Sequence, residues 1–131
     1  MKILVADDDR VHVHLVSSRL RAKGFDIMIA FDAMQAWMAA TRSPIDAIVL
    51  DIQMPGGTGL EVLRKLKSST RTCSLPVIVV SGSIDPQAIE EVKALGADAY
   101  LPKPVEIDQL VSVLRQVLGA GNACSKENYI M

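Results

Sequence analysis

The chain has few of the residues that define disulfide-rich, membrane-spanning or nucleic-acid-binding proteins. Its two cysteines, Cys73 and Cys124, match no zinc or redox spacing, so we expect incidental thiols and no structural disulfide. No apolar run approaches the ~20 residues that a membrane helix needs. The net charge is -1, which favours neither nucleic acid nor an acidic membrane surface as a partner. Aromatic residues make up 4% of the chain, so the core must be mainly aliphatic.

Secretion is also not indicated. The apolar start of the chain, residues 1–6, is followed at once by Asp7, Asp8 and Asp9, which leaves no room for the ~7–15-residue apolar core of a signal peptide. We therefore expect a cytoplasmic protein. The 131 residues, half of them hydrophobic, suit one domain with a substantial core.

The most informative stretch is residues 45–59, which reads IDAIVLDIQMPGGTG. Its unbroken aliphatic run, residues 47–50, indicates a strand buried on both faces. The run stops at Asp51, and Pro55 with the following glycines ends the strand. Asp51 should therefore lie at the carboxyl end of a central parallel strand, where open α/β sheets bind ligands.

The rest of the chain repeats this strand-then-helix pattern. Asp9 is a suitable N-cap, and Asp32 with Gln35 forms a capping pair. Such regular alternation predicts an α/β fold, with one doubly wound parallel sheet covered by helices on both faces. The expected strands are 2–6, 25–30, 47–50, 77–80 and 97–101, and the expected helices lie near 10–23, 34–40, 60–66, 86–95 and 107–118.

Apolar spacing suggests which helix faces are buried. In the first helix, Val11/Leu15 and Val16/Leu20 are expected to form i,i+4 pairs, and the methionines at 28, 34 and 38 are expected to be core residues. In the last helix, Val113 and Gln116 are expected on the outer side, too little to argue for a dimer.

Several polar residues directly follow the predicted strands. Parallel strands bring their carboxyl ends to one edge, so these residues should share a cleft: Asp7, Asp8, Asp51, Ser81 and Lys103. Two like charges ~4 Å apart repel by about 4 kcal/mol at an effective dielectric constant near 20. A solvated capping turn would explain an isolated triple aspartate. With Asp51 beside it, a hard cation such as Mg²⁺ is the better explanation.

An aspartate next to a metal and a lysine can act as a nucleophile. Lys103, Ser81 and the metal all suit negative oxygens, which points to a phosphoryl group as the electrophile. The expected product is an aspartyl phosphate at Asp51.

At this point the sequence resembles the receiver domains of bacterial two-component response regulators. Four segments carry the resemblance, ILVADDD at 3–9, IVLDIQMPGGTGLEVL at 48–63, PVIVVSGS at 76–83 and GADAYLPKP at 96–104. The resemblance implies a flavodoxin-like sheet of order 2-1-3-4-5, which is the known order for this family. It also implies a receiver domain over residues 1–118 and a C-terminal tail over 119–131.

The resemblance assigns roles at the matching positions. It makes Asp51 the phosphoacceptor, with Asp8, Asp51 and the backbone carbonyl of Gln53 as direct Mg²⁺ ligands. Asp7 then acts mainly through metal-bound water, and Lys103 pairs with the phosphoryl oxygens. The chain would be a self-modifying phosphoacceptor with slow autodephosphorylation and not a classical enzyme.

The resemblance also implies a switch. Ser81 should move toward the phosphoryl oxygens, Tyr100 should turn inward, and the bond before Pro104 should be cis. The surface made by the fourth helix, fifth strand and fifth helix would then change for a downstream protein or output domain, or for a homodimer. The phosphoryl donor would be a sensor histidine kinase or a histidine phosphotransfer protein, and neither nucleic acid nor membrane is expected to bind this domain directly.

Three departures from the family pattern lie near this site. Gly57-Thr58 replaces the usual Met-Asp, Ser81 replaces the commoner threonine, and Gln53 and Ser83 occupy variable positions that affect phosphoryl lifetime.

Two other functions remain open on the sequence. A phosphatase of the haloacid dehalogenase type also uses an aspartate nucleophile with Mg²⁺, but its motif is broken here by Gln53 and Pro55. A pseudo-receiver, never phosphorylated, would be an interaction module only. His12 and His14, two positions apart on a helix, are expected to be surface or half-buried residues and not ligands.

Overall fold

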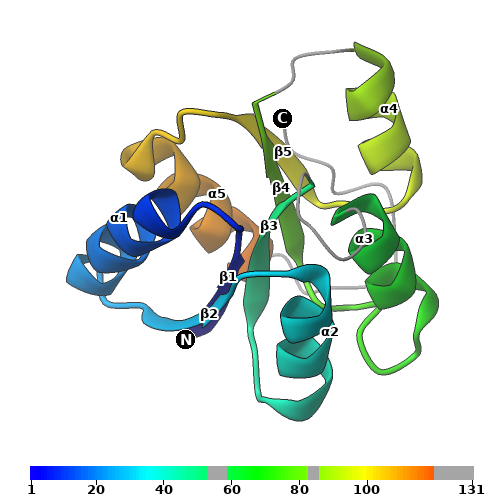
Figure 1. Cartoon of the computed structure of the whole chain (residues 1–131), viewed down its shortest axis with the longest axis horizontal. Coiled ribbons are helices and arrows are strands. Elements are labelled where there is room, and N and C mark those ends of the chain that lie inside the picture. Colours follow the sequence, from blue (N-terminus) through cyan, green and yellow to red (C-terminus); the bar gives the residue numbers. More distant parts are fainter. Residues whose placement is uncertain (53–58, 83–85, 120–131) are drawn as a thin grey trace.

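The computed structural model describes residues 1–52, 59–82 and 86–119. In these residues five strands alternate with five helices around one parallel sheet of order β2-β1-β3-β4-β5 (Figure 1). The predicted fold class and strand order are therefore confirmed. The elements are β1 (Lys2–Ala6), α1 (Arg10–Ala22), β2 (Asp26–Ala30), α2 (Ala33–Arg42), β3 (Ala47–Asp51), α3 (Gly59–Ser68), β4 (Val77–Ser81), α4 (Pro86–Ala94), β5 (Ala99–Pro102) and α5 (Ile107–Gly119).

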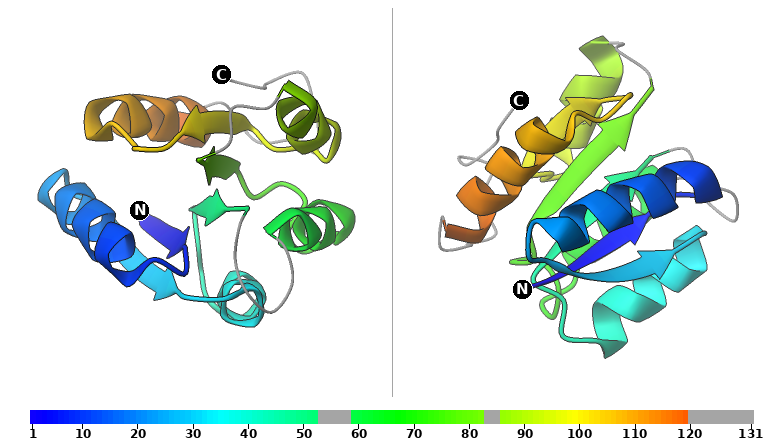
Figure 2. Two further views of the ribbon diagram at one scale, coloured as in Figure 1. Left: turned by 45° about the horizontal axis from the view of Figure 1, so that its top comes forward. Right: turned by 90° about the vertical axis from the view of Figure 1, so that its left-hand side faces the viewer.

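The molecule has three layers. Helices α1 and α5 cover one face of the sheet, and α2, α3 and α4 cover the other (Figures 1 and 2). Strands β3 and β4 are buried along their whole length, as their unbroken aliphatic sequences predict. Each strand sends alternate side chains into the two cores, so Leu50 packs on the α2–α3 side and Val49 on the α1–α5 side.

The register of the strands brings the carboxyl ends of β1, β3 and β4 together. Ala6 of β1 is paired with Leu50 of β3, so the residues that follow them, Asp7 and Asp51, emerge side by side at one edge of the sheet. On the other side of β3, Asp51 is paired with Val80 of β4. Three consecutive neighbours in the sheet thus end at the same edge.

The buried face of α1 includes one of the two expected i,i+4 pairs. Val16 and Leu20 are buried, together with Val13, whereas Val11 is 79% exposed and Leu15 is 50% exposed. Positions 11 and 13 are about 200° apart on a helix, so one face cannot bury both. The Val11/Leu15 pair therefore lies on the exposed side of α1.

Two predictions about helix faces are wrong. Helix α2 lies against the sheet through Ala33, Ala36 and Ala40, which leaves Met34 71% exposed and Met38 38% exposed. Small alanines let the helix approach the sheet closely, and the adjacent methionines then point outward. In α5, Val113 is buried in the α1–α5 core and does not lie on the outer side.

Local signals for helix starts are confirmed where the structure describes them. The Asp9 carboxylate accepts hydrogen bonds from the amides of Val11 and His12. Oδ1 of Asp32 accepts the amide of Gln35 at 2.8 Å, and Oε1 of Gln35 accepts the amide of Phe31, one residue before the cap, at 2.8 Å. The loop with Gly57-Thr58 lies outside the described residues.

The state of Cys73 differs from the prediction. Cys73 is disulfide-bonded, so the expectation of an incidental thiol at this position is corrected. Among the helices of the described residues, none has the length and apolar character needed to cross a bilayer.

Candidate functional site

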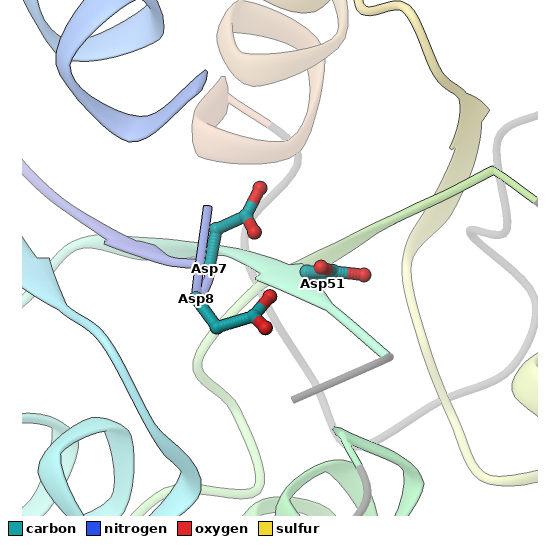
Figure 3. A group of neighbouring side chains, drawn as sticks. All are labelled: Asp7, Asp8 and Asp51. Atoms are coloured by element: carbon teal, nitrogen blue, oxygen red, sulfur yellow. The ribbon is translucent and has the colours of Figure 1, made fainter. Parts of the chain in front are cut away.

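Three carboxylates meet at the carboxyl edge of the sheet. Asp7 and Asp8 follow β1, Asp51 ends β3, and one oxygen of each lies within 4.8 Å of the others (Figure 3). Asp7 is 3% exposed and Asp51 is 4% exposed, whereas Asp8 is open to solvent. The sequence-based prediction that these three side chains converge is confirmed by this geometry.

Lys103 bridges the two buried carboxylates. Its Nζ atom lies 3.1 Å from Oδ2 of Asp7 and 3.1 Å from Oδ2 of Asp51. The lysine is held by its backbone, because its amide donates to the carbonyl oxygen of Ser81 at 2.8 Å. The next peptide bond, Lys103–Pro104, is cis.

These contacts change how the charged groups titrate. Burial opposes the charged carboxylate of Asp7, but hydrogen bonds from its neighbours, the Asp9 amide foremost, outweigh burial and hold its pKa below the ordinary value of 3.8. Burial likewise opposes the ammonium of Lys103, yet the carboxylates of Asp7 and Asp51 raise its pKa above the ordinary 10.5. Both groups are therefore charged at neutral pH.

His12 contributes a contact that the sequence did not indicate. Its Nδ1 lies 2.7 Å from Oδ2 of Asp7, and its side chain is 20% exposed. The sequence predicts a surface or half-buried histidine at this position, and His12 is half-buried. No motif signals the contact, which joins the first turn of α1 to the residue that follows β1.

The site suits a hard divalent cation. Three carboxylates bring three negative charges, and among the described residues one ammonium, that of Lys103, lies within ion-pair distance of them. All the candidate ligands are oxygen atoms, which Mg²⁺ prefers. The cluster therefore fits the expected cofactor. Gln53, whose carbonyl is the remaining expected ligand, lies outside the described residues.

The two expected switch residues are both buried. Ser81, at the end of β4, is 0% exposed, and Tyr100 in β5 is 3% exposed. Tyr100 packs in the core on the α2–α3–α4 side of the sheet. The ring of Tyr100 therefore already points inward in this structure.

Comparison with known proteins supports the same interpretation. The family model of the response regulator receiver domain matches residues 3–115. The chain belongs to this family. The receiver is similar to the probable transcriptional regulatory protein TcrX of Mycobacterium tuberculosis, with 38% identity over 119 residues, 88% of this chain and 49% of that protein.

Solved receiver structures agree closely with this one. The receiver domain of the Francisella response regulator 1452 has a TM-score of 0.85 at 30% identity, covering 91% of this chain and 97% of that one. The receiver domain of the sensor histidine kinase PA1611 of Pseudomonas aeruginosa, solved with magnesium in its active-site cleft, has a TM-score of 0.83 at 25% identity, covering 90% and 97%. This receiver spans about half the length of the curated relatives it matches.

Proposed function

We propose that this receiver accepts a phosphoryl group on Asp51, with Mg²⁺, from a sensor histidine kinase or a histidine phosphotransfer protein. The observation that carries the proposal is the position of Lys103, whose Nζ lies 3.1 Å from both Asp7 and Asp51. A cation so placed beside a carboxylate can contact the oxygens of an incoming phosphoryl group. The cofactor assignment has independent support from the magnesium found in the PA1611 receiver.

The residues would share the work as follows. Asp8 and Asp51, with the carbonyl of Gln53, would hold the cation, and Asp7 would act mainly through water. The bound Mg²⁺ supplies charge neutralisation for the transferred oxygens. Lys103 and Ser81 orient the same oxygens, which is most of what phosphoryl transfer requires.

The chemistry balances without any further reactant. An oxygen of the Asp51 carboxylate attacks the phosphorus of the donor, and the bond from phosphorus to the leaving atom breaks. That atom keeps the electron pair; it is an imidazole nitrogen in phosphohistidine and a carboxylate oxygen in acetyl phosphate. The product is an aspartyl phosphate.

The output follows from the elements that bear the switch residues. Ser81 ends β4 and Tyr100 lies in β5, so new contacts at Ser81 are passed to the surface formed by α4, β5 and α5. This surface is the proposed contact for a downstream protein, for an output domain or for a second receiver. We assign residues 1–118 to the receiver and 119–131 to a C-terminal tail.

The test is phosphorylation by a small donor. Acetyl phosphate in excess with Mg²⁺ should add the mass of one phosphoryl group, and Asp51→Asn should abolish the addition. Asp26→Asn, an exposed aspartate of β2, is the matched control and should be phosphorylated normally. A native chain with no mass increase would refute phosphoacceptance and favour a pseudo-receiver. Many turnovers on an external phosphate ester would instead favour a phosphatase.

A further inference from the structure

Asp7 is held by donors from three parts of the chain. Its Oδ1 accepts the amide of Asp9 at 3.0 Å, while its Oδ2 accepts both Lys103 Nζ at 3.1 Å and His12 Nδ1 at 2.7 Å. The shortest of these contacts is the one from His12. Because Asp7 is 3% exposed, bulk water does little to hold its carboxylate in place.

The donors to Asp7 have different roles in the proposed reaction. Lys103 is shared between Asp7 and Asp51, and its Nζ must turn toward the phosphoryl oxygens once they arrive. The contact of Oδ2 with Lys103 is then weakened. His12 has no such second task, since it lies in the first turn of α1, whose start is fixed by the Asp9 cap.

The chemistry of the pair fixes which atom carries the proton. An ionised carboxylate accepts hydrogen bonds and donates none, so Nδ1 of His12 must be the donor in the 2.7 Å contact. The other ring nitrogen, Nε2, is buried and has no hydrogen-bond partner among the described residues. The bond to Asp7 is therefore the one that orients this ring.

We propose that His12 is a positioning residue for the metal site: its Nδ1–H holds the carboxylate of Asp7 in place, so that Lys103 is free to move to the phosphoryl group. The proposal rests on the function proposed above for Asp7 and Lys103. Hydrogen-bond partners of metal-site side chains fix the orientation of those side chains in other proteins, and the loss of such a partner commonly costs ~10–100-fold in metal affinity or activity.

Two substitutions of His12 separate positioning from simple packing. His12→Leu removes the donor and keeps an apolar side chain of similar reach. His12→Asn keeps an N–H donor near the position of Nδ1 while removing most of the ring. We expect the dissociation constant for Mg²⁺, measured by calorimetric titration of the metal-free full chain, to rise about tenfold in His12→Leu and to return to within about threefold of native in His12→Asn.

Controls use the neighbouring histidine. His14, exposed on the same helix, receives the same two substitutions and should leave Mg²⁺ affinity unchanged. If His12→Leu does not fold, His12→Ala replaces it, because alanine also carries no side-chain donor and favours the helix. Native-like Mg²⁺ affinity in the donor-free variant, or equal weakening in both variants, would refute the proposal.

A spectroscopic test needs no variant. Long-range proton–nitrogen spectra of the native metal-free chain should show the proton of His12 on Nδ1, and a ring with bare Nδ1 would also refute the proposal. Failure of the native chain to accept a phosphoryl group would sink the proposed function instead, while the Mg²⁺ contrast between the His12 variants could still be measured.

Discussion

At the residue scale, Gly59 shows how tightly the chain closes around the end of β3. Its amide donates to the carbonyl oxygen of Ile52 at 2.9 Å, and a Cβ atom placed on it would lie 2.3 Å from the Cα of Ile52 and 2.4 Å from the carbonyl oxygen of Asp51. Those neighbours are backbone atoms and cannot rotate away. A side chain at this position would therefore displace the strand end that carries Asp51.

We expect Gly59→Ala to lower the free energy of unfolding by about 1–3 kcal/mol, the usual cost of forcing extra atoms into a packed site. Chemical denaturation of the native chain and the variant measures the difference. Gly82→Ala is the matched control, because a Cβ at Gly82 meets nothing within 4 Å. Equal stability of Gly59→Ala and the native chain would show that the backbone can yield here.

At the element scale, α4 and α5 border the same proposed output surface but are anchored very differently. Helix α4 buries one residue, Val92, with Ile89 and Leu95 partly covered. Helix α5 buries five residues, including Leu110 and Leu114, in the α1–α5 core. A helix held by so little buried apolar area opens locally at low free-energy cost.

Amide hydrogen exchange should therefore be faster in α4 than in α5. We expect a difference of about tenfold or more in exchange rate, which corresponds to ~1.4 kcal/mol in opening free energy. Exchange of the unphosphorylated chain followed by mass spectrometry gives this comparison within one molecule. Equal protection of the two helices would show that α4 is held by interactions other than core packing.

A second feature at this scale is an ion pair between Lys67 and Asp98, which lies near the amino ends of β4 and β5, away from the carboxylate cluster. Lys67, near the end of α3, contacts Asp98 at 3.0 Å and the carbonyl oxygen of Leu75 at 2.9 Å, and Asp98 also accepts the amide of Val77 at 2.8 Å. One lysine thus ties α3 to the starts of β4 and β5. Both charged groups are largely buried, so removing either one would leave the other as an unpaired buried charge.

At the scale of the whole molecule, stability and cation binding are linked. A cation that binds the folded chain alone stabilises it by about 1.4 kcal/mol at tenfold excess over its dissociation constant. Lys103 offsets part of the repulsion among the three carboxylates, which lie within 4.8 Å, but a net negative charge remains when no metal is bound. The metal-free receiver therefore carries unfavourable charge in the folded state.

We expect Asp8→Asn to make the chain more stable when no metal is present and to remove most of the stabilisation that Mg²⁺ gives. In chelator, loss of one exposed charge should raise the free energy of unfolding by up to about 1 kcal/mol. Millimolar Mg²⁺ should raise the unfolding temperature of the native chain, but it should raise that of Asp8→Asn only slightly. The control, Asp26→Asn, should show the same increase in unfolding temperature as the native chain. A full Mg²⁺ response in Asp8→Asn would mean that the cation binds elsewhere.

The sequence by itself determined the strand–helix alternation and the convergence of the aspartates at one end of the sheet. Aliphatic runs such as residues 47–50 identify buried strands, and parallel strands must end at a common edge, so the meeting of Asp7 and Asp51 follows from local patterns. The caps at Asp9 and Asp32 were equally predictable, because capping depends on contacts within four residues.

Only the tertiary structure decided which way each helix turns. Val11 and Val13 belong to apolar stripes on different sides of α1, and packing against the sheet selects one of them. The contact between His12 and Asp7 depends on that same rotation of α1. Helical periodicity defines the stripes of a helix, whereas the choice between them is made by the surface on which the helix packs.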